Sequence, residues 1–301
     1  MVFLVTGGTG FVGRQVLREL HRAGHRIFIL SRHADSSPAR AIQQELPATI
    51  RSGDILDSKN LAEACSGIDA IIHLVGIISE VGRYTFENVH VRGTENMIRA
   101  AQQAGVKRFI HMSALGTRPD AVSRYHQSKW AAEELVRRPG LDWTIFRPSI
   151  IYGPGDGFVN LFARMSHWSP VLPLIGGGKM KFQPISVESV ASAFVQSLNR
   201  ADTFRQTYDL CGPETLTLEE IIDTVLSVTK RRRLKVRIPF AVATAQAFVA
   251  ELMFRLIGKA PPLNRDQLKM LREDNVGERM PAEELFTLPP ENFAEGINRY
   301  L

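Results

Sequence analysis

The stretch VFLVTGGTGFVG, residues 2–13, decides the fold of this chain. Four apolar residues read as a buried strand, a glycine-rich turn follows, and residues 12–23 read as a helix. A strand, a tight glycine turn and a helix form the geometry that binds the pyrophosphate of a dinucleotide. Gly7 would permit the turn, Gly10 would let backbone N–H groups approach the phosphates, and Gly13 would let the helix pack closely on the strand. The stretch therefore predicts a cofactor site rather than an ordinary glycine loop.

Composition narrows the class of protein. The chain has 301 residues, 44% of them hydrophobic and 23% charged, which suits one large α/β domain with a smaller part attached. Its two cysteines, Cys65 and Cys211, form neither a disulfide framework nor a metal-ligand spacing, so we expect a reducing compartment and no metal site. The apolar strand at the start of the chain predicts no signal peptide. A net charge of +6 favours anionic partners without identifying them.

Strand and helix patterns alternate through the first half. Further strands are expected at residues 26–31, 48–51, 70–75, 108–112 and 143–147, and the clearest helices at 85–104 and 125–137. Near-continuous apolar strands separated by helices predict a Rossmann-type, doubly wound parallel sheet covered on both faces. Beyond residue 150 glycine and proline become frequent, and helices are expected to dominate after residue 187. We expect a nucleotide-binding domain at 1–150 and a mainly helical substrate and interaction region at 151–301, interleaved with it at the carboxyl edge of the sheet.

The end of the second predicted strand bears on the type of cofactor. An Asp or Glu there would bind the ribose 2′-hydroxyl of NAD. This chain has Ser31, Arg32 and His33 instead, and a cation at this place suits the 2′-phosphate of NADP. We expect NADP(H) to be preferred over NAD(H), although Arg32 as a solvated strand-end residue is the simpler interpretation. Asp54, after the third strand, would reach the adenine edge or cap the following helix.

Tyr125 and Lys129 lie four residues apart in a predicted helix, and therefore on one face of it. A neighbouring ammonium stabilises a phenolate, so this pair would move a proton with the tyrosine pKa lowered from about 10. Such pairs also arise by chance on helix surfaces. Because this one follows the fifth strand of a nucleotide-binding half, we interpret it as a candidate catalytic pair.

Seven motifs, in this order, resemble those of the extended short-chain dehydrogenase/reductase superfamily, of the NAD-dependent epimerase/dehydratase type. They are GGTGFVG (7–13), GDILD (53–57), HLVG (73–76), NVHVRGTEN (88–96), YHQSK (125–129), RPSIIYGPGD (147–156) and FQPISVESVA (182–191). The resemblance implies that Tyr125 is the acid/base and that Lys129 bonds the nicotinamide ribose. The cofactor-binding residues expected in all are Gly7, Thr9, Gly10, Phe11, Val12, Gly13, Ser31, Arg32, Asp54, Ile55, Val75, Gly76, Asn88, Lys129, Pro148 and Ile150.

The third catalytic member departs from this pattern. The family's serine falls at Ala114, with Ser113 one place earlier. A displacement of one residue on an extended segment points a side chain the opposite way. Either the loop shifts so that Ser113 serves as the third catalytic residue, or the site lacks its carbonyl-polarising hydroxyl, and we expect the second.

The C-terminal third narrows the resemblance. PPLNRDQL (261–268) and EDNV (273–276), together with SALGT (113–117) and SRYHQSK (123–129), resemble atypical members of the superfamily, namely the accessory subunit of respiratory complex I and its bacterial relatives. This resemblance implies a retained NADPH binder connected with the respiratory membrane and with quinone metabolism.

A basic run, residues 230–237, precedes the apolar segment 239–257. In that segment Thr244, Glu251 and Arg255 fall within roughly 40° of one another on a helix. A polar stripe so narrow suits a helix in a protein core or in a lipid interface, whereas its charges and length argue against a membrane span. We favour the core interpretation and keep an anionic membrane surface as the alternative. The run lacks interleaved aromatic residues, so no nucleic acid is expected to bind.

Three functions remain open from the sequence. The first is an NADP(H)-dependent oxidoreductase acting on a quinone-related or other apolar substrate, which the Tyr125 and Lys129 pair favours. The second is a non-catalytic NADPH-holding structural or assembly protein of a respiratory or quinone-biosynthesis complex, which Ala114 favours. The third is a sugar-nucleotide epimerase or dehydratase. The expected location is the cytoplasm, peripheral on the inner face of the membrane.

Overall fold

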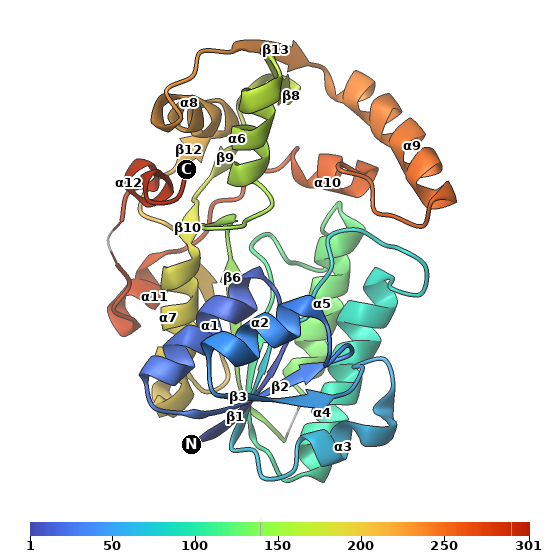
Figure 1. The fold of residues 1–301 in the computed structure, drawn as a ribbon, viewed down its shortest axis with the longest axis vertical. Coiled ribbons are helices and arrows are strands. Elements are labelled where there is room, and N and C mark those ends of the chain that lie inside the picture. The colour runs from blue at the N-terminus through green and yellow to red at the C-terminus, as the bar shows by residue number, and fades with distance from the viewer. Residues whose placement is uncertain (139, 290) are drawn as a thin grey trace.

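A seven-stranded sheet forms the centre of the computed structural model, which describes residues 1–138, 140–289 and 291–301 (Figure 1). The strand order is β3-β2-β1-β4-β5-β6-β11, and every pairing is parallel. Its strands are β1 (Val2–Thr6), β2 (Arg26–Ser31), β3 (Ala48–Ser52), β4 (Ala70–His73), β5 (Arg108–Met112), β6 (Asp142–Pro148) and β11 (Gln206–Leu210). The order reverses between β1 and β4, which is where ligands bind in open sheets of this kind. The predicted Rossmann-type fold is confirmed.

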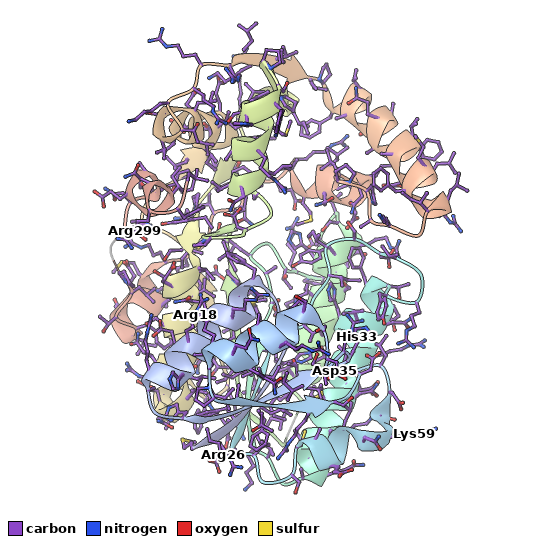
Figure 2. The ribbon with its side chains drawn as sticks, viewed as in Figure 1. Arg18, Arg26, His33, Asp35, Lys59 and Arg299 are labelled. Atoms are coloured by element: carbon purple, nitrogen blue, oxygen red, sulfur yellow. The ribbon has the colours of Figure 1, made fainter. Side chains whose placement is uncertain are left out.

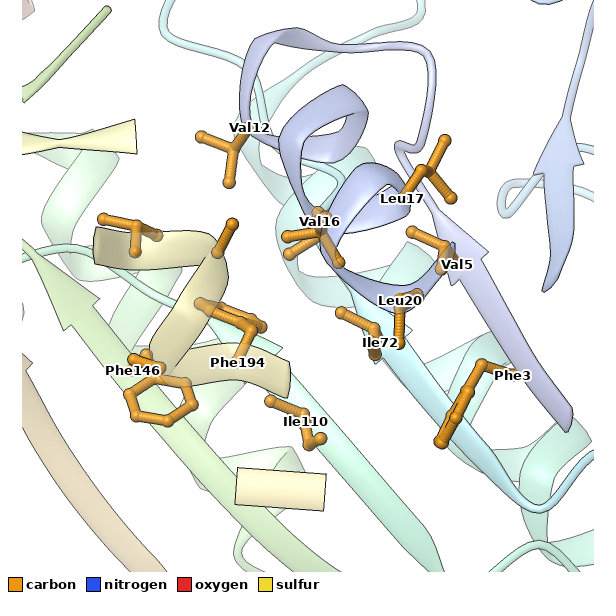
Figure 3. Packing of buried hydrophobic residues seen from close by; sticks show 14 of the residues in the cluster. Phe3, Val5, Val12, Val16, Leu17, Leu20, Ile72, Ile110, Phe146 and Phe194 are labelled. Atoms are coloured by element: carbon orange, nitrogen blue, oxygen red, sulfur yellow. The ribbon is translucent and has the colours of Figure 1, made fainter. Parts of the chain in front are cut away.

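Helices cover both faces of the sheet. They are α1 (Phe11–Arg22), α2 (Ser37–Glu45), α3 (Leu61–Ala64), α4 (Gly93–Gln103), α5 (Arg124–Val136) and α7 (Val187–Gln196). Successive residues of β1 point to opposite faces: Phe3 and Val5 join the core under α1 and α7, whereas Leu4 joins the core under α3, α4 and α5. Figure 3 shows the first of these cores, where Val16 and Leu20 of α1 pack towards the sheet.

Two elements differ from the sequence-based expectation. The predicted helix 85–104 begins as a π-helical segment, η2 (Glu87–Arg92), and continues as α4. Apolar periodicity does not reveal such a widened turn, which is common at functional sites. The seventh strand, β11, comes from a region expected to be mainly helical. It is a short edge strand that pairs only with β6, and its inner residues alternate between buried and half-buried.

Most of the second half stacks on one end of the sheet, whereas α11 (Met280–Leu285) packs beside α7 on the core next to β6 and β11 (Figure 1). Its strands are β7 (Ile151–Tyr152), β8 (Val171–Ile175), β9 (Lys181–Phe182), β10 (Ile185–Ser186), β12 (Leu216–Thr217) and β13 (Leu234–Ile238). Its α-helices are α6 (Val159–Trp168), α8 (Leu218–Val228), α9 (Phe240–Leu256), α10 (Arg265–Met270), α11 (Met280–Leu285) and α12 (Phe293–Asn298). Short 3₁₀ turns are η1 (Ser58–Asn60), η3 (Gly176–Gly178), η4 (Ser197–Asn199) and η5 (Ala201–Thr203). A separate core joins α6, α8 and α12.

The helix predicted at 239–257 is α9, and its favoured placement in a core is wrong. Only two of its residues, Ala243 and Ala247, are buried, and Figure 1 shows the helix (orange) at the outer edge of the molecule. Among the described residues, the structure contains no helix with the length and hydropathy needed to cross a bilayer.

Candidate cofactor and catalytic site

The glycine turn after β1 is as tight as the sequence predicts. Gly7 has φ +74°, which side chains rarely tolerate, and its carbonyl oxygen accepts a hydrogen bond from the Gly10 N–H at 3.0 Å. A Cβ added at Gly13 would overlap the Gly7 carbonyl oxygen and lie 2.6 Å from Gly8 Cα. The first turn of α1 therefore lies directly against the loop, and only glycine allows this approach.

The amino end of α1 is left with N–H groups that need acceptors. Gly10 is the N-cap residue, and within the described part of the chain no side chain caps the helix and no acidic residue lies in its first turn. The N–H groups of Phe11, Val12 and Gly13 have no intrahelical partner, and the helix dipole favours negative charge there. The side chain of Val12 itself is buried in the core, so its backbone is what it offers to a ligand. This arrangement fits a dinucleotide pyrophosphate.

A cluster of cations lies beyond β2. The Arg32 guanidinium stacks on the ring of Tyr84, 4.5 Å from its centroid, and Arg83 lies 5.2 Å from the same ring. Asp54 accepts from Arg83 at 2.9 Å and from the Leu56 N–H at 3.0 Å, whereas Asp57 caps the next turn. Asp54 therefore does not cap the helical turn that follows β3, because Asp57 does.

The loop that starts at Ser31 continues through His33 and Asp35 (Figure 2). Arg32 in this loop is exposed. The sequence analysis did not identify Arg83 and Tyr84, because they lie in the loop before η2, which is distant from Arg32 in the sequence but close to it in space.

Buried histidines lie behind the carboxyl ends of β1 and β4. His73 bonds the Thr6 hydroxyl at 2.7 Å, and burial lowers its pKa to about 3. His90, on η2, accepts from the Ile77 N–H through Nε2 at 3.0 Å, so its proton sits on Nδ1 and is donated to the Ser128 hydroxyl at 2.8 Å. Burial, and next the charge of Lys129, lower the His90 pKa to about 2. His90 is therefore a neutral, fixed donor that braces the helix carrying Tyr125.

Tyr125 and Lys129 both lie on α5 and face this region. The ring of Tyr125 meets the rings of His90 and Phe86 edge to face, with centroids 5.5 Å and 5.9 Å apart. Lys129 is almost fully buried and donates to the Met112 carbonyl oxygen, and a Cβ added at Gly76 would lie 4.0 Å from its ammonium. This places Lys129 beside the HLVG loop, where the resemblance puts the nicotinamide ribose.

Burial moves both pKa values of this pair. It lowers the pKa of Lys129 to about 8, while Glu133 acts in the other direction. It raises the pKa of Tyr125 to about 12, which is the opposite of the lowering expected from the sequence. Tyr125 is thus a phenol that holds its proton at neutral pH.

Ser113 is buried, and its hydroxyl donates to the Thr117 hydroxyl at 3.4 Å. Ala114 occupies the neighbouring, half-buried position. No observation tests Ser113 as a catalytic residue, so that role stays a prediction.

The remaining predicted cofactor residues lie around the same edge. Pro148 accepts a backbone hydrogen bond from Leu115, and Ile150 one from Ile185. Ile55 is buried against Gly93. The Asn88 side chain is engaged by the Arg83 carbonyl oxygen at 2.8 Å. Partly exposed residues are Thr9, Phe11, Ser31 and Val75. Ligand contact by these residues stays a prediction.

The tail motifs fasten the C-terminal part onto this site. The Asp266 carboxylate accepts from the backbone N–H groups of Arg124 and Tyr125, both at 2.9 Å, and so caps the first turn of α5. Asn264 donates to the Ile78 carbonyl oxygen at 3.1 Å. Asn275 accepts from the Ser149 hydroxyl at 2.6 Å. Sequence reasoning noticed these motifs only as a resemblance, because nothing local indicates their partners.

The glycine turn, the cation after β2 and the Tyr–Lys pair on α5 define a dinucleotide-binding protein of the short-chain dehydrogenase/reductase type. Residues 3–211 match the NAD dependent epimerase/dehydratase family, and the chain belongs to that family.

The relatives in sequence that are described below are named for different activities. The mitochondrial NADH dehydrogenase [ubiquinone] 1 alpha subcomplex subunit 9 of Arabidopsis thaliana is 30% identical over 92% of this chain and 71% of its own length. The same subunit of Mus musculus is 30% identical over 87% and 68%. A ceramide reductase of Caulobacter vibrioides is 34% identical over 64% of this chain and 60% of its own length.

Solved structures agree with the fold. The crystal structure of gox2253 has a TM-score of 0.76 at 26% identity and covers 99% of this chain and 96% of that one. A Thermus thermophilus UDP-glucose 4-epimerase in complex with NAD has a TM-score of 0.73 at 20% identity, covering 99% and 97%. The second likeness shows the fold alone.

Proposed function

We propose that this protein is an NADP(H)-dependent oxidoreductase that reduces a carbonyl or quinone group of an apolar substrate at a membrane surface. The observation that carries the proposal is the placement of Tyr125 and Lys129 beside the Gly76 loop at the carboxyl edge of the sheet. The relatives named for ceramide reduction and for the ubiquinone-reducing complex support an apolar substrate.

The residues divide the chemistry as follows. The bound dinucleotide would supply the hydride. The N–H groups at the start of α1 would hold its pyrophosphate, and Lys129 would hold the ribose next to Gly76. Tyr125, with a pKa of about 12, keeps its proton at neutral pH and would donate it to the substrate oxygen as the carbon is reduced. A protonated Tyr125 therefore favours the direction of reduction.

The preference for NADP(H) rests on Arg32. Its guanidinium is exposed at the end of β2, and Arg83 lies on the same tyrosine ring. A 2′-phosphate placed there would gain charge-assisted hydrogen bonds. Arg32→Glu should weaken NADPH binding by about tenfold to a hundredfold and leave NADH binding within about threefold, because a charged hydrogen bond contributes about 1.5–3 kcal/mol.

Calorimetric titration with both dinucleotides measures this preference. Arg22→Glu is the matched control, because Arg22 is exposed in the last turn of α1 and lies far along the helix from the glycine turn. Equal affinities of the wild-type protein for NADPH and NADH would remove the role given to Arg32.

Catalysis is tested by Tyr125→Phe, which removes one hydroxyl and keeps the ring contacts. NADPH oxidation with decylubiquinone and a panel of long-chain ketones should fall at least a hundredfold, since general acid catalysis contributes about 10²–10⁴-fold. NADPH affinity should stay within about twofold of wild type. An active Tyr125→Phe variant would show that another group supplies the proton.

One observation favours a second function, a protein that holds NADPH without turnover. The Ser113 hydroxyl is bonded to Thr117, and Ala114 stands where the family's serine is expected. In that case NADPH would raise the melting temperature of the wild-type protein, and no substrate of the panel would be consumed.

A further inference from the structure

Helix α9 is amphipathic, but its polar side faces the protein and its apolar side faces the solvent. Three of its polar residues, Thr244, Glu251 and Arg255, line a cavity on the inner side of the helix. Its outer face is open to solvent and, apart from the exposed Gln246, is apolar. The outward residues are Val242, Val249, Leu252, Met253, Leu256 and Ile257, with Leu256 82% exposed. The half-exposed ring of Phe248 lies against the Arg265 guanidinium, 5.0 Å from its centroid. A water-exposed helix ordinarily turns its apolar residues inward.

The apolar surface extends beyond the helix. Strand β13 leads directly into α9 and exposes Leu234 (71%) and Val236. The Leu234 N–H donates to the Pro170 carbonyl oxygen at 3.0 Å, which places Leu234 beside the end of α6, where Trp168 is 85% exposed. We name the outward apolar residues of α9, together with Leu234, Val236 and Trp168, the apolar ridge. An exposed apolar surface with a tryptophan at its margin is typical of proteins that rest in a lipid interface.

The cavity behind α9 has a volume of about 760 Å³ and lies between α9, α10, the start of α5 and the loop at residues 79–82. Its carboxylates are all engaged. Glu80 pairs with Arg124 at 3.1 Å, Glu251 with Arg265 at 2.8 Å, and Asp266 caps α5.

Four further cations line the same cavity: Arg255, Lys259, Lys269 and Arg272. Within the described residues, none of the four has a carboxylate at ion-pair distance. The cavity thus carries more positive than negative charge, and its carboxylates do not neutralise these four cations. It therefore suits an anionic ligand.

The position of the cavity relates it to the candidate catalytic residue. Phe86 forms part of its wall, and the Phe86 ring meets the ring of Tyr125 with centroids 5.9 Å apart. Arg124, the residue before Tyr125, also lines it. A molecule whose charged group lay in the cavity would reach Tyr125 past Phe86.

We propose that the apolar ridge lies in the interface of a bilayer containing anionic lipid and that the cavity behind α9 binds the anionic headgroup of a lipid drawn from it. The charges support lipid over a protein partner, because the four unpaired cations line the cavity on the inner face of the same helix whose outer face belongs to the apolar ridge. One molecule with an acyl chain and a phosphate suits both faces. The assignment of such a lipid as the substrate rests on the proposed function, whereas binding of the lipid does not.

The first test is flotation of the full-length protein with vesicles of phosphatidylcholine alone or with 30% phosphatidylglycerol. The wild-type protein should float with the anionic vesicles and be released by high salt. Leu252→Ser with Leu256→Ser should lower binding to anionic vesicles at least about tenfold, because it removes apolar surface that would be buried in the lipid. Both side chains are exposed, so the double substitution should leave the fold intact. Lys269→Gln with Arg272→Gln should lower it about thirtyfold, or about fivefold for each cation.

The matched control is Arg22→Gln with Arg92→Gln, which removes the same charge from exposed positions on the nucleotide-binding half and should change binding less than threefold. Calorimetry with monomeric dihexanoyl phosphatidylglycerol and with inorganic phosphate separates a headgroup site from a general phosphate site. Binding of the lipid, lost in Lys269→Gln with Arg272→Gln, supports the proposal. Binding of phosphate with equal affinity would overturn the headgroup assignment.

Three further outcomes are decisive. No flotation, or equal flotation with both vesicle types, would overturn the proposal. A wild-type dimer that Leu252→Ser with Leu256→Ser converts to a monomer, without vesicle binding, would assign the apolar ridge to a second copy of the chain instead. Vesicle binding in a protein that oxidises no NADPH would refute the proposed function and leave the lipid site standing.

Discussion

The carboxylate of Asp266 caps the helix that carries Tyr125, and its removal should be measurable in the free energy of unfolding. Asp266 accepts the N–H groups of Arg124 and Tyr125, while the Ser123 hydroxyl accepts that of His126. Loss of a capping acceptor costs about 0.5–2 kcal/mol, and loss of a negative charge at a helix amino end costs about 0.3–1 kcal/mol more. Asp266→Ala should therefore lower the unfolding free energy by about 2 kcal/mol. For a chain of 301 residues this corresponds to a fall in Tm of about 3 °C.

Urea denaturation followed by circular dichroism measures this difference, with Asp120→Ala as the control because the Asp120 side chain is 84% exposed. Asp266→Asn, which keeps one of the two acceptor oxygens, should lose about half as much. An unchanged midpoint in Asp266→Ala would refute the capping role, and a loss equal to that of Asp120→Ala would reduce it to a surface charge effect.

Two other predictions follow from the core of the nucleotide-binding half. Gly13→Ala would push a methyl group into the backbone of the glycine turn, so it should abolish NADPH binding in calorimetry, whereas retained binding would contradict the tight packing of α1 on the turn. His73, His90 and His111 are buried neutral, and burial is the first cause that lowers each pKa, to about 3 for His73 and about 2 for His90. These histidines take up protons below about pH 6.5 in the unfolded chain but not in the folded chain, so their contribution to stability is nearly constant above that pH and is lost below it. Urea denaturation at pH 7 and pH 5.5 should differ by up to about 4 kcal/mol for the three together, and equal free energies at the two pH values would show that the histidines are accessible to protons in the folded state.

Sequence reasoning located the features that depend on neighbouring residues. The strand, turn and helix at the start of the chain, five further strands and the Tyr125–Lys129 pair are all readable because apolar periodicity and glycine spacing are local signals. The predicted strands agree with β2 to β6 within two residues at each end. Strand β11 was not predicted because it lies at the edge of the sheet and its inner residues alternate between buried and half-buried positions, so it has no continuous apolar run.

Features that depend on contacts between distant segments could not be predicted. The partners of Asp266 are 141 and 142 residues away, and that of Asn275 is 126 residues away. The pKa of Tyr125 was predicted in the wrong direction because burial, rather than the charge of Lys129, determines it. The rings of Phe86 and His90, which pack against Tyr125, come from another segment of the chain. The placement of α9 in a core was predicted wrongly for a related reason. Its polar stripe is visible in the sequence, but the charged cavity that it faces is formed by other elements.

The cap on α5 also has a consequence for biosynthesis. The ribosome adds Asp266 141 residues after Tyr125, so the nascent nucleotide-binding half emerges with the first turn of that helix capped by Ser123 alone. A polypeptide truncated before α10 would keep the glycine turn yet leave the tyrosine on a frayed helix end. If Tyr125 acts as proposed, we expect a chain that ends before α10 to be less active than the full chain, because the helix that carries this residue has lost two of its capping hydrogen bonds.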